Sequence, residues 1–459
     1  MTQSPRDYKL TQQDLQAFNE NTPEAIHSII QRLDWPEAVT MSWMNMFKIT
    51  FFTTPATHRD LLVNQSHHFQ RDPRSGRIFQ FMMGDSVFTT EGADWKRRRR
   101  LVQPAFHARR VNAYAETMAG YAAEMVAAWQ DDTTVDIERQ MTDVTMRVIA
   151  STMFGVDIKS TVDDIAGLMQ TILHVSEQRV KEIIPRPDWW PSPAYRRQRA
   201  ALDDLKRILA EIIAERRQSN EDRGDLLSML LLSQDEDGDL LSDDEALSEA
   251  ITLFVAGHET TAVTLMWAFK LLSDHPDVEA KLHAELDTVL GGRIPTLADL
   301  PHLPYTEMVM KETLRLYPAA YNFGRVSTQA VNIDGYALPA KRMVMLSPYI
   351  LHRHPKLFAQ PDVFQPERFA KDAPQEIERY AFVPFGAGPR VCLGNSFAML
   401  EIQLMLATIA GRVSLALAPG TQVRMTPRVT LHPVVEGASG LPMTVRRRVP
   451  VSTPIHMAE

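Results

Sequence analysis

Apolar residues recur every three or four positions over long stretches of the chain, with charged residues between them. This spacing predicts amphipathic helices, most clearly over residues 111–129, 162–183, 194–219, 243–273, 275–290 and 304–317. Strand-like runs are few and short, at 47–52, 331–338 and 342–346. Most of the 29 prolines lie between these elements, where they end helices. The pattern predicts a mainly α protein with a small β region.

The domain organisation follows from what the pattern lacks. A length of 459 residues is compatible with two or three domains, but the sequence has no internal repeat, low-complexity tract or flexible linker. We therefore expect one domain over residues 1–459, with a β-rich part at about 40–90 and 320–350 and helices in the remainder. Apolar residues make up 44% and charged residues 23%, which excludes a disordered or fibrous chain.

Charge and cysteine usage narrow the class of protein. The formal net charge is −8, so there is no overall basic surplus for binding nucleic acid. A single cysteine, Cys392, cannot form an intrachain disulfide. No stretch reaches the roughly 18 apolar residues of a membrane span, and the polar N-terminus does not resemble a signal peptide. We expect a soluble, cytoplasmic protein.

The segment around Cys392 carries the strongest chemical signal. Its three glycines, at 386, 388 and 394, allow sharp turns, and a helical pattern follows at 396–411. A cysteine just before a helix N-terminus is favoured as a thiolate, and Arg390 can bind a carboxylate. A thiolate beside a guanidinium suits haem, which has an iron and two propionates. A lone cysteine is more often structural, but the glycines, Phe385 and Arg390 favour a ligand here.

The stretch from Phe385 to Gly394 resembles the haem-binding signature of the cytochrome P450 family, Phe-x-x-Gly-x-Arg-x-Cys-x-Gly, at every defined position. Ala398 and Glu401 also fit. The resemblance is to the soluble bacterial type. It implies the cytochrome P450 fold, a triangular helical prism around buried haem b. It further implies that Cys392 binds the iron and that Phe385, Gly386 and Arg390 contact the haem.

A second motif, Ala256-Gly257-His-Glu259-Thr260-Thr261, lies inside the predicted helix 243–273. A glycine inside a helix costs about 1 kcal/mol relative to alanine, and paired threonines are poor helix formers, so the helix is expected to bend and make room there. The motif resembles the family's Ala-Gly-x-(Asp/Glu)-Thr-(Thr/Ser). The resemblance implies that Ala256 and Gly257 border the haem, and that Thr260 and Glu259 deliver protons during oxygen activation.

The basic run Trp95-Lys-Arg-Arg-Arg-Arg100 has two interpretations. It is typical of a solvated helix face, but Trp95 and Arg99 resemble the family's Trp-x-x-x-Arg pair that contacts the haem propionates. Arg325 resembles a further propionate-binding arginine. The other four basic residues, Lys96, Arg97, Arg98 and Arg100, form a hypothetical docking patch for an acidic ferredoxin or flavin-type reductase.

Glu312 and Arg315 are spaced to pair on one helix face. In the family, such a pair joins a later arginine, here Arg368, in a buried structural network behind the haem. Removing one partner is expected to cost several kcal/mol, because it strands a buried charge.

The resemblance implies a haem-thiolate monooxygenase that inserts one atom of O2 into an organic substrate by hydroxylation or epoxidation. Electrons would come ultimately from NAD(P)H through a separate partner. Family topology places the 184–193 loop and several apolar residues around the substrate, which favours an apolar or amphipathic molecule: Phe79, Phe81, Met82, Phe88, Leu253, Ala256, Ala320 and Phe323. Fatty acid, terpenoid and drug-like substrates all stay open.

Three alternatives remain at this stage. A peroxide-driven peroxygenase does not rely on an acid–threonine pair, so Glu259 and Thr260 argue against it. A haem-based sensor without turnover stays open. A helical nucleic-acid binder would use the arginine run but lacks support from the net charge. We expect a monomer, and a reductase module fused beyond Glu459 stays possible.

Overall fold

The computed structural model describes residues 3–44, 47–155, 159–180, 186, 189–219 and 221–449. Its α-helices are α1 Gln12–Glu20, α2 Thr22–Arg32, α3 Pro55–Arg59, α4 Pro73–Met83, α5 Gly92–Val102, α6 Ala108–Asn112, α7 Ala115–Ala127, α8 Ile137–Phe154, α9 Lys159–Val180, α10 Pro193–Ser219, α11 Leu226–Leu232, α12 Asp243–Asp274, α13 Pro276–Leu290, α14 Pro304–Leu316, α15 Pro348–Leu351 and α16 Asn395–Ala410. Within these residues, no helix is long and apolar enough to cross a membrane.

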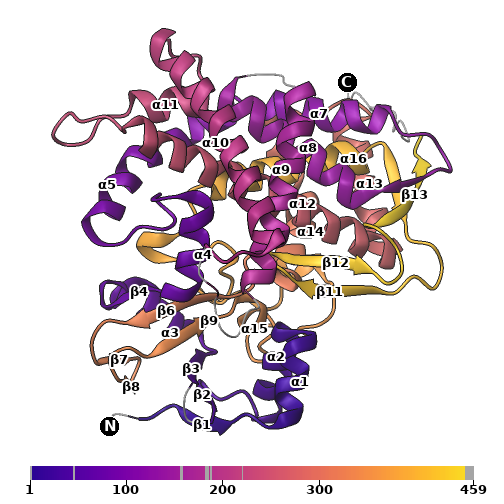
Figure 1. The fold of residues 1–459 in the computed structure, drawn as a ribbon. Helices are drawn as coiled ribbons and strands as arrows, with labels where there is room; N and C mark the ends of the chain where they lie inside the picture. Colours follow the sequence, from indigo (N-terminus) through magenta and orange to yellow (C-terminus); the bar gives the residue numbers. More distant parts are fainter. Residues whose placement is uncertain are drawn as a thin grey trace.

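The strands are β1 Arg6–Lys9, β2 Ala38–Trp43, β3 Phe47–Phe52, β4 Phe69–Arg71, β5 Thr134–Asp136, β6 Phe323–Ser327, β7 Val331–Ile333, β8 Tyr336–Leu338, β9 Met343–Leu346, β10 Val413–Ala416, β11 Val423–Pro427, β12 Leu431–Val435 and β13 Pro442–Arg447. The largest sheet has the order β1-β2-β3-β9-β6-β4. It lies with α1 and α2 at one end of the molecule, and the long helices stack beyond it (Figure 1).

The register of this sheet has a chemical consequence. β4 and β6 pair antiparallel, and Arg71 stands directly opposite Arg325. Directly opposed residues of paired strands have side chains close together on one face. The sheet therefore brings two arginines together that are 254 positions apart in the sequence (325 − 71).

The long helix α12 owes its start to a capping box. The Ser242 side chain accepts a hydrogen bond from the Glu245 backbone, and the Glu245 carboxylate accepts one from the Ser242 backbone. Acidic residues in the first turn, Asp243 among them, complement the helix dipole. The helix then continues for 32 residues without a break.

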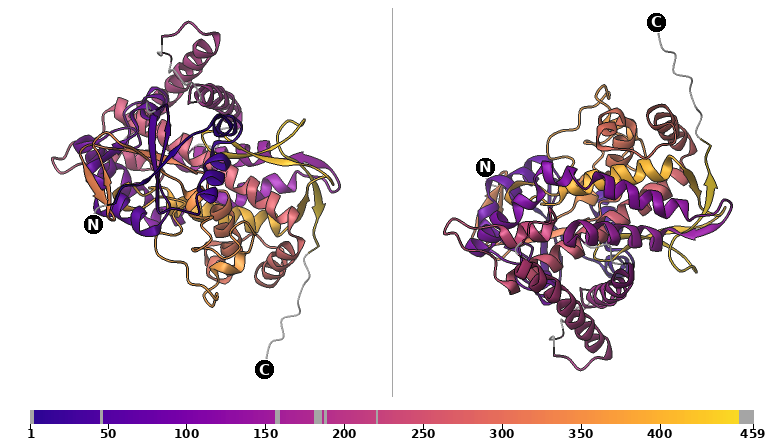
Figure 2. Two further views of the ribbon diagram at one scale, coloured as in Figure 1. Left: turned by 90° about the horizontal axis from the view of Figure 1, so that it is seen from below. Right: turned by 90° about the horizontal axis from the view of Figure 1, so that it is seen from above.

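The two larger of three hydrophobic clusters meet along α12. Its N-terminal half, from Ala246 to Val255, packs in one core with α8 and α9, whereas Ala262 to Leu272 packs in the other with α13 and α14. Residues of α16 also contribute to both cores. In the view from above, α16 runs alongside the helix α7 (Figure 2, right). The two larger clusters of described core residues thus share the helices α7, α8, α12 and α16. A third, smaller cluster is formed largely by residues of the strands.

Most predicted helices are confirmed within a few residues, but three expectations need correction, two for strands and one for a helix. The run 331–338 is a hairpin of β7 and β8, because Asp334 and Gly335 both have positive φ and form its turn. Strands also occur outside 40–90 and 320–350, at β1, β5 and β10–β13. The predicted helix 111–129 is divided between α6 and α7. Part of the 184–193 loop, at 184–185 and 187–188, lies outside the described residues.

Candidate functional site

The loop before α16 folds back on itself. The Cys392 N–H donates to the Phe385 carbonyl at 3.0 Å, and the Val391 N–H donates to the Gly388 carbonyl at 3.1 Å. Gly386 and Gly388 both have a φ of +71°, a conformation that glycine adopts at little cost. A Cβ at Gly388 would lie 2.0 Å from the Leu62 carbonyl oxygen, so the loop also needs glycine for close packing.

Cys392 borders a cavity of about 370 Å³ between this loop and α12. The thiol is exposed toward the cavity and is otherwise enclosed by protein. The described residues that line the cavity are mostly apolar, with four arginines among them: Leu62, Arg71, Val87, Phe88, Trp95, Arg99, Phe106, Ile149, Thr252, Leu253, Ala256, Gly257, Thr260, Thr261, Thr264, Leu314, Ala319, Ala320, Phe323, Arg325, Pro384–Ala387, Arg390–Gly394, Phe397, Ala398 and Ile402.

The electrostatics of Cys392 differ from the sequence prediction of a favoured thiolate. The Gly394 N–H and the Arg99 guanidinium do lower the pKa of the thiol, but burial outweighs both and raises it above its ordinary value. The backbone at the helix N-terminus therefore lowers the pKa of the thiol, as expected, but not enough to ionise the sulfur by itself. A cation in the cavity would favour the thiolate.

Four guanidinium groups gather at the cavity wall. Burial and neighbouring arginines lower the pKa of Arg71 to about 9 and that of Arg325 to about 10. Arg390 pairs with Glu91 and stacks over Trp95, its guanidinium carbon 4.2 Å from the ring centroid. The Nε of Arg71 is buried without a hydrogen-bond partner. The buried guanidinium groups repel one another, and a ligand with negative charges would relieve this repulsion.

On α12, the two predicted proton-transfer residues face different surroundings. Thr260 lines the cavity, and its hydroxyl donates to the Ala256 carbonyl at 2.7 Å. Glu259 is not among the cavity-lining residues; its Oε1 lies 2.6 Å from His432 Nε2 on β12 and accepts from the Thr430 hydroxyl at 3.0 Å. These contacts outweigh burial and lower the pKa of Glu259 to about 2.

Gly257 serves packing rather than a break in the helix. A Cβ there would lie 2.9 Å from Ile149 Cδ1, so glycine allows α8 to approach α12 closely. The expected bend does not interrupt the α-helical assignment of α12, which is continuous over the motif.

A buried carboxyl group lies beside the same motif. The Thr261 hydroxyl donates to Glu401 Oε2 at 3.0 Å, while Glu401 Oε1 has no hydrogen-bond partner. Burial raises the pKa of Glu401 to about 8. Glu401 is therefore a neutral acid near pH 7, on the helix that follows Cys392.

Comparison with known proteins identifies the family. The sequence model of cytochrome P450 matches residues 16–435. Cyclooctatin synthase of Streptomyces melanosporofaciens is 39% identical over 353 residues, which cover 76% of this chain and 77% of the relative. Cyclooctat-9-en-7-ol 5-monooxygenase of the same organism is 40% identical and covers 74% of each chain. The chain belongs to the cytochrome P450 family.

Two further comparisons agree with this. Pentalenene oxygenase of Streptomyces avermitilis is 34% identical, covering 76% of this chain and 78% of the relative. A solved structure described as the cytochrome P450DA heme domain matches with a TM-score of 0.87 and 24% identity, over 98% of this chain and 99% of that chain. The latter shows that the fold is that of cytochromes P450.

Cytochromes P450 bind haem b and activate O2, and their electrons come from NAD(P)H through a partner. Together with the relatives named as oxygenases, this makes the protein a haem-dependent monooxygenase. The cavity fits the cofactor: it presents one thiol, an apolar interior and the guanidinium group of Arg71. The Nε of Arg71 lies 3.9 Å from Glu91 but has no hydrogen-bond partner, so it can meet a propionate.

Behind the cavity of this cytochrome P450, Glu312 and Arg315 pair at 2.7 and 2.8 Å, and Arg368 Nε lies 3.0 Å from Glu312. Arg315 also donates to the His352 carbonyl at 2.8 Å. The His352 ring accepts from the Val383 N–H, two residues before Phe385. The network therefore connects α14 to the loop that holds Cys392.

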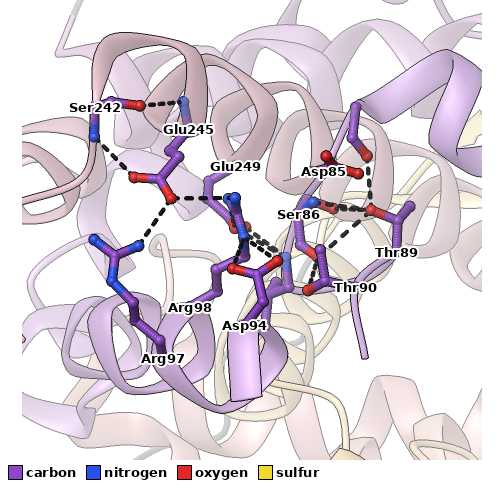
Figure 3. Close-up of polar contacts among 12 residues, drawn as sticks. Asp85, Ser86, Thr89, Thr90, Asp94, Arg97, Arg98, Ser242, Glu245 and Glu249 are labelled. Atoms are coloured by element: carbon purple, nitrogen blue, oxygen red, sulfur yellow. Dashed lines mark hydrogen bonds and ion pairs between the residues drawn. The ribbon is translucent and has the colours of Figure 1, made fainter. Parts of the chain in front are cut away.

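In the basic run of α5, the three arginines of the hypothetical docking patch are engaged in ion pairs. Arg97 pairs with Asp235 and Glu245 at 2.8 Å each, Arg98 is buried, and Arg100 pairs with Glu236. Figure 3 shows Arg97 and Arg98 directed at Glu245. The hypothesis of a docking patch is wrong for Arg98, which is buried. Arg100 and its partner Glu236 are both exposed, so the patch stays a prediction for Lys96, Arg97 and Arg100.

The predicted substrate residues divide in two. Phe88, Leu253, Ala256, Ala320 and Phe323 line the cavity. By contrast, three residues on α4 do not: Phe79, Phe81 and Met82. The reason is that α4 packs its apolar side into the second core, where Met82 is fully buried. The ring of Phe79 contacts that of Phe88, with ring centroids 5.2 Å apart.

Several site residues have no clear signal in the sequence. Arg71, Glu91 and His432 are brought to the site by pairing of distant strands and loops. Glu401 belongs to the family pattern, but its neutral state depends on burial. Glu249 reaches the cavity wall only because α12 passes the turn at 84–90.

Proposed function

We propose that Cys392 binds the haem iron as a thiolate, and that the protein hydroxylates or epoxidises an apolar substrate in the adjoining cavity. The observation that carries this is the position of the only cysteine of the sequence, in a cavity with four arginines in its wall. When bound, the haem supplies oxygen activation. The arginines bind and orient its propionates: Arg71, Arg99, Arg325 and Arg390. Trp95 stacks on Arg390 and holds it in place.

The spectrum of the reduced protein with carbon monoxide tests this assignment. We expect the red-shifted Soret band that indicates thiolate ligation. Cys392→Ser should abolish this band while the protein stays folded by circular dichroism. A wild-type spectrum without the red-shifted band would overturn the assignment of Cys392.

For proton delivery, we propose that the Thr260 hydroxyl, which donates to the Ala256 carbonyl, turns to donate its single hydrogen bond to an oxygen held in the cavity. Glu259 would exchange protons with solvent. His432 contacts Glu259 through Nε2, and its Nδ1 lies 3.7 Å from Glu138, which is partly exposed. This row of groups supports a path from the surface to α12.

Thr260→Ala should lower the amount of product formed per O2 consumed by roughly tenfold or more, because proton transfer by a positioned group contributes that much. Thr264→Ala is the matched control, since its hydroxyl donates to a helix carbonyl in the same way, at 2.8 Å. Unchanged coupling in Thr260→Ala would remove Thr260 from this role.

We propose a cyclic hydrocarbon or its alcohol as the substrate. Two relatives are named for such compounds, pentalenene and cyclooctat-9-en-7-ol. The lining at Leu253, Ala256, Ala319, Ala320 and Phe323 is apolar. A fatty acid would need a cation at that end of the cavity, and the described lining has arginines only among the proposed propionate partners.

A low-to-high-spin shift of the haem spectrum distinguishes these substrates. We expect the shift with pentalenene and not with palmitate at equal concentration. A shift with palmitate alone would favour a fatty acid hydroxylase. The shift also tests binding without depending on a redox partner.

A ferredoxin or a flavin-type reductase is the proposed electron donor. Of the basic run, Lys96 is exposed and available to such a partner. Lys96→Glu should slow reduction by an acidic ferredoxin at low salt, and the effect should fade at high salt. Equal reduction rates at low salt would exclude Lys96 from the docking surface.

A further inference from the structure

A tight turn at residues 84–90 forms one wall of the cavity. The Thr89 hydroxyl donates to the Gly84 carbonyl at 2.6 Å, and the Ser86 N–H donates to the Thr89 hydroxyl at 2.8 Å. The Thr90 hydroxyl donates to the Ser86 carbonyl at 2.8 Å (Figure 3). These bonds stiffen the turn, which presents Val87 and Phe88 to the cavity.

The turn is joined to α12 by one carboxylate. Glu249 is fully buried, and its two oxygens lie 2.9 and 3.1 Å from the Val87 backbone nitrogen, from which they accept a hydrogen bond. Arg98 on α5 lies 3.4 Å from the same carboxylate. Glu249 therefore joins α12, α5 and the turn at a single point beside the cavity (Figure 3).

Glu249 shares its ion-pair partner with two other carboxylates. Arg98 also pairs with Asp94 at 3.0 Å and with Glu245 at 3.2 Å, so three carboxylates share one buried guanidinium. Burial raises the pKa of Glu249 to about 7 despite Arg98. An apolar residue at position 249 would avoid this desolvation cost, so the hydrogen bond to Val87 is the distinctive contribution of the glutamate.

We propose that Glu249 is a positioning residue that fixes the turn 84–90 through the Val87 amide and thereby determines which ligands fit the cavity. Phe88 transmits this effect. Its ring packs against Phe79 and under the Arg71 guanidinium, whose carbon lies 4.3 Å from the ring centroid. A shift of the turn would move Phe88 and enlarge or block the cavity. The inference rests on the proposed function of this cavity.

Hydrogen–deuterium exchange of the 84–90 peptide tests the tether directly in the haem-bound protein. Glu249→Leu should speed exchange there by roughly tenfold or more, because a buried N–H loses its partner. Glu249→Gln keeps an oxygen that can accept from Val87 and should retain slow exchange. Equal, fast exchange in both variants would show that this hydrogen bond is not the tether and would overturn the proposal.

Ligand size is the second measurement. Clotrimazole and imidazole both bind haem proteins by coordination and shift the Soret band. In Glu249→Leu, the Kd of bulky clotrimazole should change by about fivefold or more, while that of imidazole changes by less than about twofold. Unchanged clotrimazole binding would overturn the role in ligand fit.

Glu245→Gln is the matched control, since it shares Arg98 but makes no hydrogen bond to the turn, and Gln at this position can still cap the helix. It should leave both measurements at wild-type values; if it matched Glu249→Leu, loss of charge near Arg98 would explain the effect and the proposal would fail. A missing carbon monoxide band in the wild type would instead refute the proposed function, which keeps the two failures distinguishable.

Discussion

Three glutamates near the cavity differ in charge because their hydrogen-bond partners differ. Glu259 is held ionised by His432 and Thr430, with a pKa of about 2. Glu401 has one hydroxyl partner and a pKa of about 8, and Glu249 lies between them at about 7. At the residue scale, burial raises all three values, and only a sufficient set of donors reverses the shift.

The neutral state of Glu401 predicts a pH dependence of stability. Because its pKa is about 8 in the folded protein against an ordinary 4.5, the folded state binds the extra proton between these values. Its contribution to the free energy of unfolding is therefore present at low pH and is lost as pH rises from about 4.5 to about 8. Glu401→Gln should show a flatter dependence in urea unfolding at pH 5 and pH 8, and an equal slope would contradict a neutral Glu401.

His432→Phe should destabilise the protein by about 3 kcal/mol near pH 7, because Glu259 loses its main partner while buried. The pKa of Glu259 is depressed from 4.5 to about 2, so this contribution is present above about 4.5 and lost only as pH falls below it. Arg428→Gln, which removes a neighbour of His432 Nδ1 at 3.3 Å, is the control. If urea unfolding of His432→Phe showed a loss of stability only at acidic pH and none near pH 7, the result would contradict this prediction.

Single positions differ in how well the sequence predicts them. Cys392, Arg99, Arg325, Arg390 and Thr260 all line the cavity. The motifs that carry them are local and have fixed spacing, so the sequence can point to them, while their roles stay predictions. The motif also predicts Glu259 as a relay, but its partner His432 comes from a distant hairpin. Three-dimensional packing also decides where Phe79, Phe81 and Met82 lie, since an apolar residue on a helix suits a core as well as a pocket.

At the scale of elements, the loop before α16 depends on glycine where neighbours are closest. Gly388→Ala places a Cβ 2.0 Å from the Leu62 carbonyl oxygen at a φ of +71°, so the loop must shift. We expect a loss well above the roughly 1–2 kcal/mol that positive φ alone costs, together with weaker haem retention.

Gly420→Ala is the control for this prediction. Its φ is +82°, but no atom lies within 4 Å of the added Cβ, so only the conformational cost applies. Urea unfolding of both variants gives the comparison. Equal losses would show that the approach to Leu62 does not constrain the loop.

Helices are more predictable than strands for a physical reason. A helix such as α12 makes its hydrogen bonds locally and shows its buried face as a repeat over 32 residues. The strands β4, β5 and β7 have three residues each, and their partners lie far away in the sequence or across a turn. Such short segments carry too few positions for an alternating pattern to emerge.

At the scale of the whole molecule, the cavity lies where the sheet, α12 and the loop before α16 meet, and the arginines in its wall come from β4, α5, β6 and that loop. Without an anionic cofactor, Arg71, Arg325 and Arg390 repel one another. The arrangement therefore favours binding of an anionic cofactor but lowers the stability of the cofactor-free protein.

Arg325→Gln should therefore have opposite effects in the two states. The haem-free protein should gain about 1 kcal/mol in free energy of unfolding, because repulsion and a buried charge are removed. The haem-bound protein should lose haem to apomyoglobin roughly tenfold faster, because a charge-assisted hydrogen bond is lost. Arg446→Gln, in an exposed pair with Asp132, should change neither rate nor stability. If Arg325→Gln lowered the stability of both the haem-free and the haem-bound protein, the inferred repulsion among the arginines would be contradicted.

The sharing of α7, α8, α12 and α16 between the two larger hydrophobic clusters has a thermodynamic consequence. If one cluster unfolds, the shared helices lose packing contacts that also stabilise the other cluster. The expectation of one domain over residues 1–459 stays a prediction, and it translates into a single cooperative heat-absorption peak. Calorimetric and van't Hoff enthalpies should then agree, and two separable peaks would reveal halves that hold together independently.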